Sequence, residues 1–128
     1  MFLNRYEALK GSQLCFWDLD LRDNTVFLSD GWGQFYGTEN VPSNPKLHDL
    51  HNLLHPEDLP LVEKAFFNTI KGVTDTYQIE HRVRTFSGGY RWLYSRGRVT
   101  ARDATGRAIR MSGTNLDIHE RHVLQESV

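Results

Sequence analysis

Alternation of apolar and polar residues marks five stretches of this chain as β-strands. Two of them, LCFWDLDL and TVFLS, are separated by Arg22-Asp23-Asn24, which predicts a hairpin. Three longer stretches follow after residue 75, namely TYQIEHRVRTF, YRWLYSRGRVTAR and RAIRMSGTNLDI. They are joined by Ser87-Gly88-Gly89 and by Asp103-Ala104-Thr105-Gly106, and such short connections predict an antiparallel meander.

Between the two groups of strands, the period of the apolar residues becomes helical. DGWGQFYG (residues 30–37) predicts a two-turn helix, and LHDLHNLL (residues 47–54) predicts a short helix that buries its leucines. A longer helix is expected to run to about Lys71, with Val62, Phe66 and Ile70 on one side. The order of two strands, several helices and three strands predicts an α+β protein, with helices packed on one face of an antiparallel sheet.

Each end of the chain is also predicted to form a helix. Leu3, Tyr6 and Leu9 recur at helical spacing before Gly11, which indicates a short amphipathic flanking helix over residues 1–10. At the other end, HERHVLQESV (residues 119–128) is polar and compatible with a helix.

Length and composition indicate one folded domain. The chain has 128 residues, of which 39% are apolar and 12% aromatic, enough for a single core. No apolar run approaches the roughly 20 residues of a membrane span, and no signal peptide opens the chain, so we expect no membrane contact. The single cysteine, Cys15, excludes an internal disulfide and a thiolate-rich zinc site, and it fits a reducing, cytoplasmic location.

Positive charge is concentrated in the three C-terminal strands. Eight arginines lie from Arg82 to Arg110, against one acid, Asp103. The aromatic residues interleaved with them are Tyr90, Trp92 and Tyr94. An anion-binding or nucleic-acid-binding surface is therefore an alternative function. Arginines that line the solvent face of a twisted sheet produce the same pattern, and we favour that interpretation, with no nucleic-acid partner.

Three histidines in HDLHNLLHPED raise the possibility of a metal site, as in a small metalloenzyme. They are His48, His51 and His55. Pro56 disfavours helical angles at the residue before it, so the third histidine should leave the helical frame and the set should not converge. We instead predict that HPE forms a separate turn and that the long helix starts with Asp58 as N-cap, which keeps Pro60 in the first turn. No metal site is predicted.

Several of these stretches also occur in the order typical of a known family. They are FWDLDL, LSDGWGQFYG, HPEDL, TYQIEHRVRTFSGGYRW, YSRG and ARDATGRAIRMSGTNLDIHER. Together they cover residues from about Gly11 to Arg121, and in this order they resemble a PAS domain. The resemblance is to the PAS fold-3 type with its C-terminal PAC motif, found in bacterial sensory-box signalling proteins.

The resemblance implies a fold and a role. The fold is a five-stranded antiparallel sheet whose inner face is covered by helices around a central cleft, here over residues 11–118. The role is that of a sensory domain that detects a small ligand, redox state or light, or that holds a homodimer together. Such domains act on a covalently linked output domain, a histidine kinase or a diguanylate cyclase.

DIHER matches the family's exit motif, so the resemblance places the signal exit at the start of the C-terminal linker helix. The residues concerned are Asp117, Ile118, Glu120 and Arg121. The aspartate is suited to cap the helix, and a glutamate three residues later has the spacing of a capping box.

The resemblance also bears on cofactors. Heme-binding members use a histidine on the long helix, and EDLPLVEKAFFNTIKG contains none, which argues against heme in that mode. Light-sensing members form a covalent flavin adduct through a cysteine in a helix motif, whereas Cys15 lies on the first strand. Covalent flavin photochemistry is therefore argued against, non-covalent flavin stays open, and the cofactor is unknown.

Pocket residues are expected on the last two strands. In flavin-binding relatives, an amide two residues before the exit aspartate contacts the ligand, and Asn115 holds that position. Met111 and Asn115 share one face by the period of two, and Tyr94 is a neighbour on the preceding strand. We name these three as pocket candidates, with core packing as the alternative. No nucleophilic triad or phosphate loop is evident, so no catalytic residue is predicted and this domain alone is not expected to be an enzyme.

Overall fold

The computed structural model describes residues 14–29, 45–85 and 88–126. In chain order the elements are β1 (Leu14–Asp20), β2 (Thr25–Leu28), α3 (Leu47–His51), α4 (Leu59–Ile70), β3 (Tyr77–Arg84), β4 (Tyr90–Arg102), β5 (Ala108–Asp117) and α5 (His119–Glu126). The helices predicted over residues 1–10 and 30–37 lie outside the described residues.

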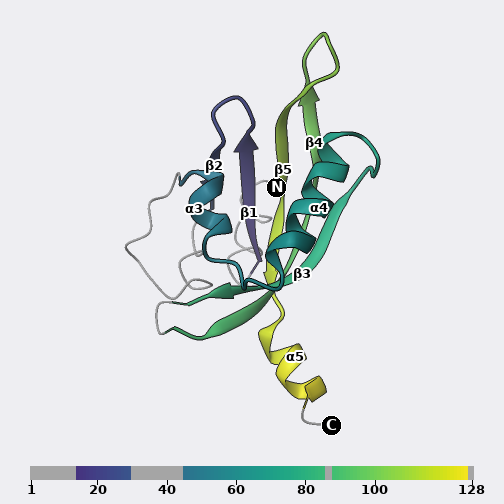
Figure 1. Ribbon diagram of the computed structural model, residues 1–128. Helices are drawn as coiled ribbons and strands as arrows, with labels where there is room; N and C mark the ends of the chain where they lie inside the picture. Colours follow the sequence, from purple (N-terminus) through teal and green to yellow (C-terminus); the bar gives the residue numbers. More distant parts are fainter. Residues whose placement is uncertain (1–13, 30–44, 86–87, 127–128) are drawn as a thin grey trace, which may run out of the picture.

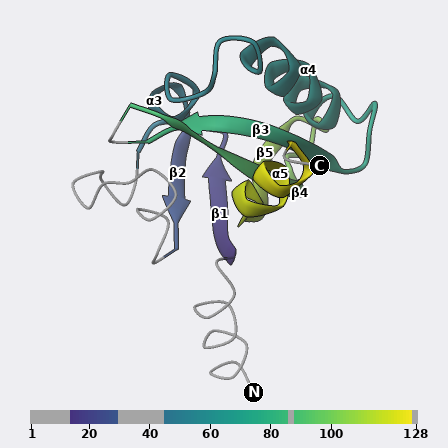
Figure 2. The same ribbon diagram turned by 90° about the horizontal axis from the view of Figure 1, so that it is seen from below.

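The five strands form one antiparallel sheet in the order β2-β1-β5-β4-β3. Helices α3 and α4 lie on the same face of this sheet, as the two views show (Figures 1 and 2). The predicted α+β class, the hairpin and the meander are thus confirmed. None of the helices described is long and apolar enough to cross a membrane.

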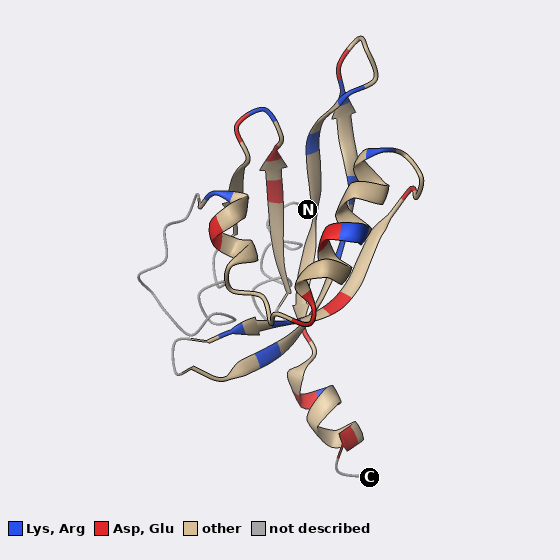
Figure 3. Cartoon of the chain, in the orientation of Figure 1, with Lys and Arg blue, Asp and Glu red and all other residues tan. Residues whose placement is uncertain are grey.

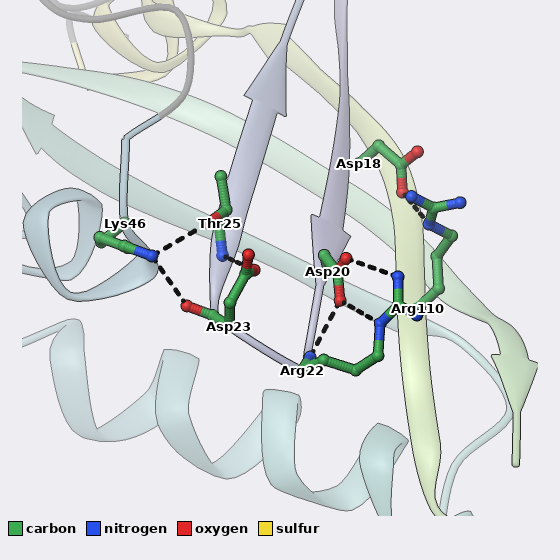
Figure 4. A network of polar contacts seen from close by, with 7 residues as sticks. All are labelled: Asp18, Asp20, Arg22, Asp23, Thr25, Lys46 and Arg110. Carbon is green, nitrogen blue, oxygen red and sulfur yellow. Dashed lines mark hydrogen bonds and ion pairs between the residues drawn. The ribbon is translucent and has the colours of Figure 1, made fainter.

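The hairpin between β1 and β2 is fixed by its own polar residues (Figure 4). Asn24 adopts a φ of 58°, a left-handed conformation that asparagine tolerates in tight turns. The Asp20 carboxylate accepts hydrogen bonds from the side chain and backbone N–H of Arg22, which lower its pKa to about 2. Lys46 Nζ donates to the Asp23 carbonyl and to Thr25 Oγ1, so the start of α3 is tied to the same turn.

The stretch HDLHNLLHPED covers the outer edge of β3. Helix α3 ends at His51, earlier than predicted, and the chain then forms an isolated bridge between Leu54 and Val83. The His55 N–H donates to the Arg82 carbonyl at 3.0 Å. An edge strand with unpaired backbone groups invites association, and this segment satisfies the groups of Arg82 and Arg84 at one end of β3.

Two glycines leave room for a tryptophan on the inner face of the sheet. Trp17 on β1 is in register with Gly113 on β5, which is in register with Gly97 on β4. A Cβ atom on Gly97 would lie 2.7 Å from the Trp17 ring, and one on Gly113 would lie 2.5 Å from it. The indole therefore lies directly against the backbone of the two central strands and forms part of the core.

Candidate functional site

A cavity of about 80 Å³ lies between the inner face of the sheet and the two covering helices. Its walls are mainly apolar, with Trp17 and Tyr77 from the sheet and Val62 and Phe66 from α4. The Trp17 and Tyr77 rings meet edge to face, with 6.2 Å between centroids. A concave space with apolar walls and few polar groups is the usual form of a small-molecule site.

Three polar side chains cross the inner face of the sheet and line this cavity. His81 on β3, Ser95 on β4 and Asn115 on β5 come from adjacent strands. His81 Nε2 lies 2.8 Å from Ser95 Oγ, and Ser95 Oγ donates to Asn115 Oδ1 at 2.6 Å. We call this chain of hydrogen bonds the inner relay.

The inner relay determines the tautomer of His81. Because the single hydroxyl proton of Ser95 is used in the hydrogen bond to Asn115, Ser95 Oγ must accept a hydrogen bond from His81 Nε2–H. His81 Nδ1 is then an unprotonated acceptor, and among the described residues it has no hydrogen-bond partner although it is buried. An unsatisfied buried polar atom of this kind costs about 1–3 kcal/mol.

His81 is neutral near pH 7. Its side chain is 5% exposed, and burial lowers its pKa to about 4, an effect that the negative charge of Asp58 partly opposes. His51, which also lines the cavity, has its pKa lowered by burial as well. The cavity therefore presents the neutral imidazole of His81 beside its apolar walls.

The predicted pocket residues have different positions in the structure. Asn115 lines the cavity. Met111 is completely buried in the core between Leu19 and Val99, with which it is in register, and it does not reach the cavity wall.

The placement of Tyr94 at the cavity is wrong. On β4 the inner positions belong to Leu93 and Ser95, which are buried, so Tyr94 lies on the opposite face. Its hydroxyl donates to Gln78 Oε1 at 3.0 Å. Tyr94 was predicted as a neighbour of Asn115 on the preceding strand, but the register pairs Asn115 with Ser95, and alternation along β4 then places Tyr94 on the outer face.

His81 and Ser95 were missed in the sequence. A signal for the histidine was present, because Tyr77, Ile79, His81 and Val83 alternate with polar residues along β3. Ser95 has no comparable signal, since its role depends on lying between His81 and Asn115 across three strands.

At the signal exit, the start of α5 is fixed to β4. The Asp117 carboxylate accepts the N–H of His119, the first residue of α5, at 2.9 Å and pairs with Arg91 Nη2 at 2.8 Å. Ile118 is buried, and its N–H donates to the Trp92 carbonyl. Glu120 is exposed in the first turn.

On the outer face of the sheet, α5 packs against a tryptophan and a glutamate. The His122 ring is stacked on Trp92 with 4.0 Å between centroids and 5° between planes. Glu80 on β3 pairs with His122 at 2.6 Å and with Arg121 at 3.1 Å, and the hydrogen bond from His122 lowers the pKa of this glutamate. These contacts, with Arg82 over the Trp92 ring at 5.0 Å, constitute what we call the outer clamp.

Arg82 also connects the outer clamp to α4. Asp58 occupies the N-cap position of α4 and Pro60 lies in its first turn, as predicted. The Asp58 carboxylate does not cap the helix, however, but pairs with Arg82 at 2.7 Å and accepts its backbone N–H. Burial acts to raise the pKa of Asp58, but these hydrogen bonds outweigh it and hold the pKa below its ordinary value.

The three histidines of HDLHNLLHPED are directed to separate partners. His48 contacts Asn52, His51 meets Phe66 edge to face, and His55 Nδ1 accepts the N–H of Glu57. Within residues 14–29, 45–85 and 88–126, no three histidine, cysteine or acidic side chains converge as a metal site would require.

Basic residues are spread along β3, β4 and β5 (Figure 3). Arg82 and Arg91 form the ion pairs described above, and Arg110 pairs with Asp18 at 3.3 Å. Arg102 donates to the carbonyls of Ile70 and Gly106. At least these four of the eight arginines therefore have partners in the described part of the protein, as expected for a structural role.

Comparison with protein families supports the same fold. A family model described as PAS fold matches residues 25–115 of this chain. Hybrid signal transduction histidine kinase A from Dictyostelium discoideum is 29% identical in an alignment of 100 residues, which covers 70% of this chain and 5% of that protein. The chain therefore spans about one twentieth of this relative.

Solved structures agree with this match. A sensory box histidine kinase/response regulator from Burkholderia thailandensis E264 is 28% identical, and its structure superposes with a TM-score of 0.83. The superposition covers 97% of this chain and 91% of the other. The N-terminal domain of a diguanylate cyclase with PAS/PAC sensor from Marinobacter aquaeolei is 20% identical. Its TM-score is 0.73, covering 85% of this chain and 98% of the other, and it supports the fold alone.

Proposed function

We propose a sensory function in signal transduction for this chain, which belongs to the PAS fold family. In this proposal the cavity binds a small molecule, and α5 carries the signal to a covalently linked output domain. A histidine kinase or a diguanylate cyclase is the output domain that the relatives suggest. In this proposal the domain comprises residues 11–118, and the linker helix starts at residue 119. The domain acts as a homodimer in the cytoplasm and catalyses no reaction of its own.

The observation that carries the proposal is the arrangement of three consecutive residues on β3. His81 faces the cavity, while Glu80 and Arg82 on either side of it belong to the outer clamp. Successive residues of a strand point to opposite faces, so a shift of β3 caused by a ligand also displaces the groups that hold α5. Signal exit through Asp117, Ile118, Glu120 and Arg121 follows from this geometry as a proposal.

A second connection runs through α4. Val62 and Phe66 line the cavity, and Asp58 at the start of the same helix binds Arg82. Arg82 lies over Trp92, which stacks on His122 of α5. A ligand that moves α4 would therefore act on α5 through a short series of direct contacts, a form of switching known in packed domains.

A cavity-filling substitution tests this function without a known ligand. Val62→Phe places an aromatic ring at the cavity wall, whereas Leu61→Phe adds the same group one residue away at a position that is 59% exposed. We expect hydrogen exchange of the α5 amides to change in Val62→Phe and to stay as in the wild type in Leu61→Phe. Equal α5 exchange in the two folded variants would contradict coupling between the cavity and α5.

Native mass spectrometry of freshly purified protein, with its visible spectrum, would test ligand binding independently. A co-purified small molecule is the supporting result.

A further inference from the structure

The inner relay leaves the cavity with one specific chemical requirement. His81 Nε2 is committed to Ser95, and its Nδ1 lone pair has no partner among the described residues. The histidine lines the cavity, so a molecule in the cavity can lie beside this ring. Buried acceptors in folded proteins are nearly always satisfied, and the missing partner here is a hydrogen-bond donor.

The charge around the cavity restricts that donor. His51, the other histidine of the lining, has its pKa lowered by burial, which favours the neutral ring. Asp58 is the acid whose charge acts on His81, and it is already paired with Arg82. No acidic side chain is among the described residues that line the cavity, and Glu63, whose charge acts on His51, lines the neighbouring groove. A cationic ligand would therefore lack a counter-charge inside the cavity, and burying an unpaired charge is strongly unfavourable.

The size of the cavity restricts the ligand further. The space between the described walls is about 80 Å³, compared with the roughly 150 Å³ of an apolar cavity that admits benzene. Sites for drug-sized ligands and large cofactors measure about 300–1,000 Å³. The described walls therefore suit one five-membered ring or a molecule of similar size.

A surface groove offers a route to this site. Leu47, His51 and Phe66 line both the cavity and a groove of about 710 Å³ between α3, α4 and the ends of the β1–β2 and β4–β5 hairpins. These three side chains thus form the partition between the groove and the cavity, and none of them belongs to the inner relay.

We infer that the cavity takes a compact, uncharged molecule with an apolar body and one N–H or O–H group that donates a hydrogen bond to His81 Nδ1. This inference rests on the proposed sensory function, because it names the class of ligand for the same cavity. In this inference, His81 is the residue that distinguishes ligands with a hydrogen-bond donor from ligands of the same shape that lack one.

Pyrrole and furan are a matched pair of probes, since both are five-membered rings of similar size and only pyrrole carries an N–H. We expect pyrrole to bind the wild-type protein about tenfold more tightly than furan in an NMR titration. In His81→Phe, which keeps an aromatic ring and removes the acceptor, the two probes should bind equally. If that variant does not fold, the ¹⁵N resonance of His81 Nδ1 in the wild type replaces it, with an upfield shift expected on addition of pyrrole and none with furan.

Two results would overturn the inference. One is binding of furan at least as tight as that of pyrrole. The other is an Nδ1 resonance that is already typical of a hydrogen-bonded acceptor before any probe is added and does not change with pyrrole, because a buried water would then satisfy the atom. Neither result decides the sensory proposal, which fails separately if the α5 exchange of Val62→Phe equals that of Leu61→Phe.

Discussion

Polar side chains on the two faces of β3 differ in charge, burial and hydrogen bonding. On the inner face, His81 is buried, uncharged and satisfied at only one of its two ring nitrogens. On the outer face, Glu80 and Arg82 are charged and bonded to several partners from α4 and α5. The charged groups of the outer face have their ion-pair partners within the protein, whereas His81 Nδ1 of the inner relay lacks a hydrogen-bond donor among the described residues.

This difference indicates that the inner face of β3 binds the ligand and that the outer face transmits the signal. A ligand that satisfies the unpaired atom lowers the free energy of the conformation that binds it. Binding can therefore shift the equilibrium between conformations of the domain. The outer clamp needs no further partner, but each of its contacts can be strained or released by movement of β3 or α4. Substitutions on each face therefore test separate parts of the comparison.

The largest expected effect comes from the outer face. Arg82→Met leaves the Asp58 carboxylate, whose side chain is 8% exposed, with a backbone N–H but without its cation. We expect a loss of about 3 kcal/mol in the free energy of unfolding, because removal of one partner strands a buried charge. Urea unfolding measures it.

Arg96→Met is the matched control, since Arg96 is exposed on the same sheet. It should change the free energy of unfolding by no more than about 0.5 kcal/mol. Equal losses in the two variants would show that the pair between Arg82 and Asp58 has no special role.

The next effect belongs to the inner face and depends on pH. Burial lowers the pKa of His81 from 6.5 to about 4, so between these values the unfolded chain binds more protons than the folded protein. Stability should therefore fall as pH drops through this window, by about 2 kcal/mol from pH 7 to pH 5. Thermal or urea unfolding at each pH measures the loss.

His81→Phe should remove most of this dependence. His51→Phe is the comparison, because burial lowers the pKa of His51 in the same direction and part of the slope belongs to it. Asp58 and Glu80 also have lowered pKa values, so their contributions appear at more acidic pH and are retained in both variants. An unchanged slope between pH 7 and pH 5 in His81→Phe would contradict the assignment of a neutral buried histidine.

The two faces also differ in how far the sequence could predict them. Local patterns were sufficient for the strands, for the hairpin with Asn24 and for the start of α4 at Asp58, because turn chemistry and alternation act over a few residues. The direction of the Asp58 carboxylate was not predictable in this way, since Arg82 lies 24 residues further along the chain.

The cavity shows the same limit. Asn115 was predicted from the exit motif, but Tyr94 lies on the outer face, because the register pairs Asn115 with Ser95. The Trp17 ring lies against Gly97, so the residues of β4 in phase with this glycine, Ser95 among them, face inward. The inner relay depends on the register of three strands, which no single strand reveals.

The smallest expected effect tests whether the outer clamp holds α5 by stacking or by charge. His122→Ala removes both the stack on Trp92 and the hydrogen bond to Glu80, and we expect a loss of about 1 kcal/mol with faster hydrogen exchange in α5. His122→Phe keeps an aromatic ring on Trp92 but cannot bond the carboxylate. If stacking holds the helix, exchange in His122→Phe stays near that of the wild type, whereas exchange as fast as in His122→Ala would mean that Glu80 holds it. Val123→Ala, at a position that is 47% exposed on the same helix, should leave α5 exchange unchanged and excludes a general loss of helix stability.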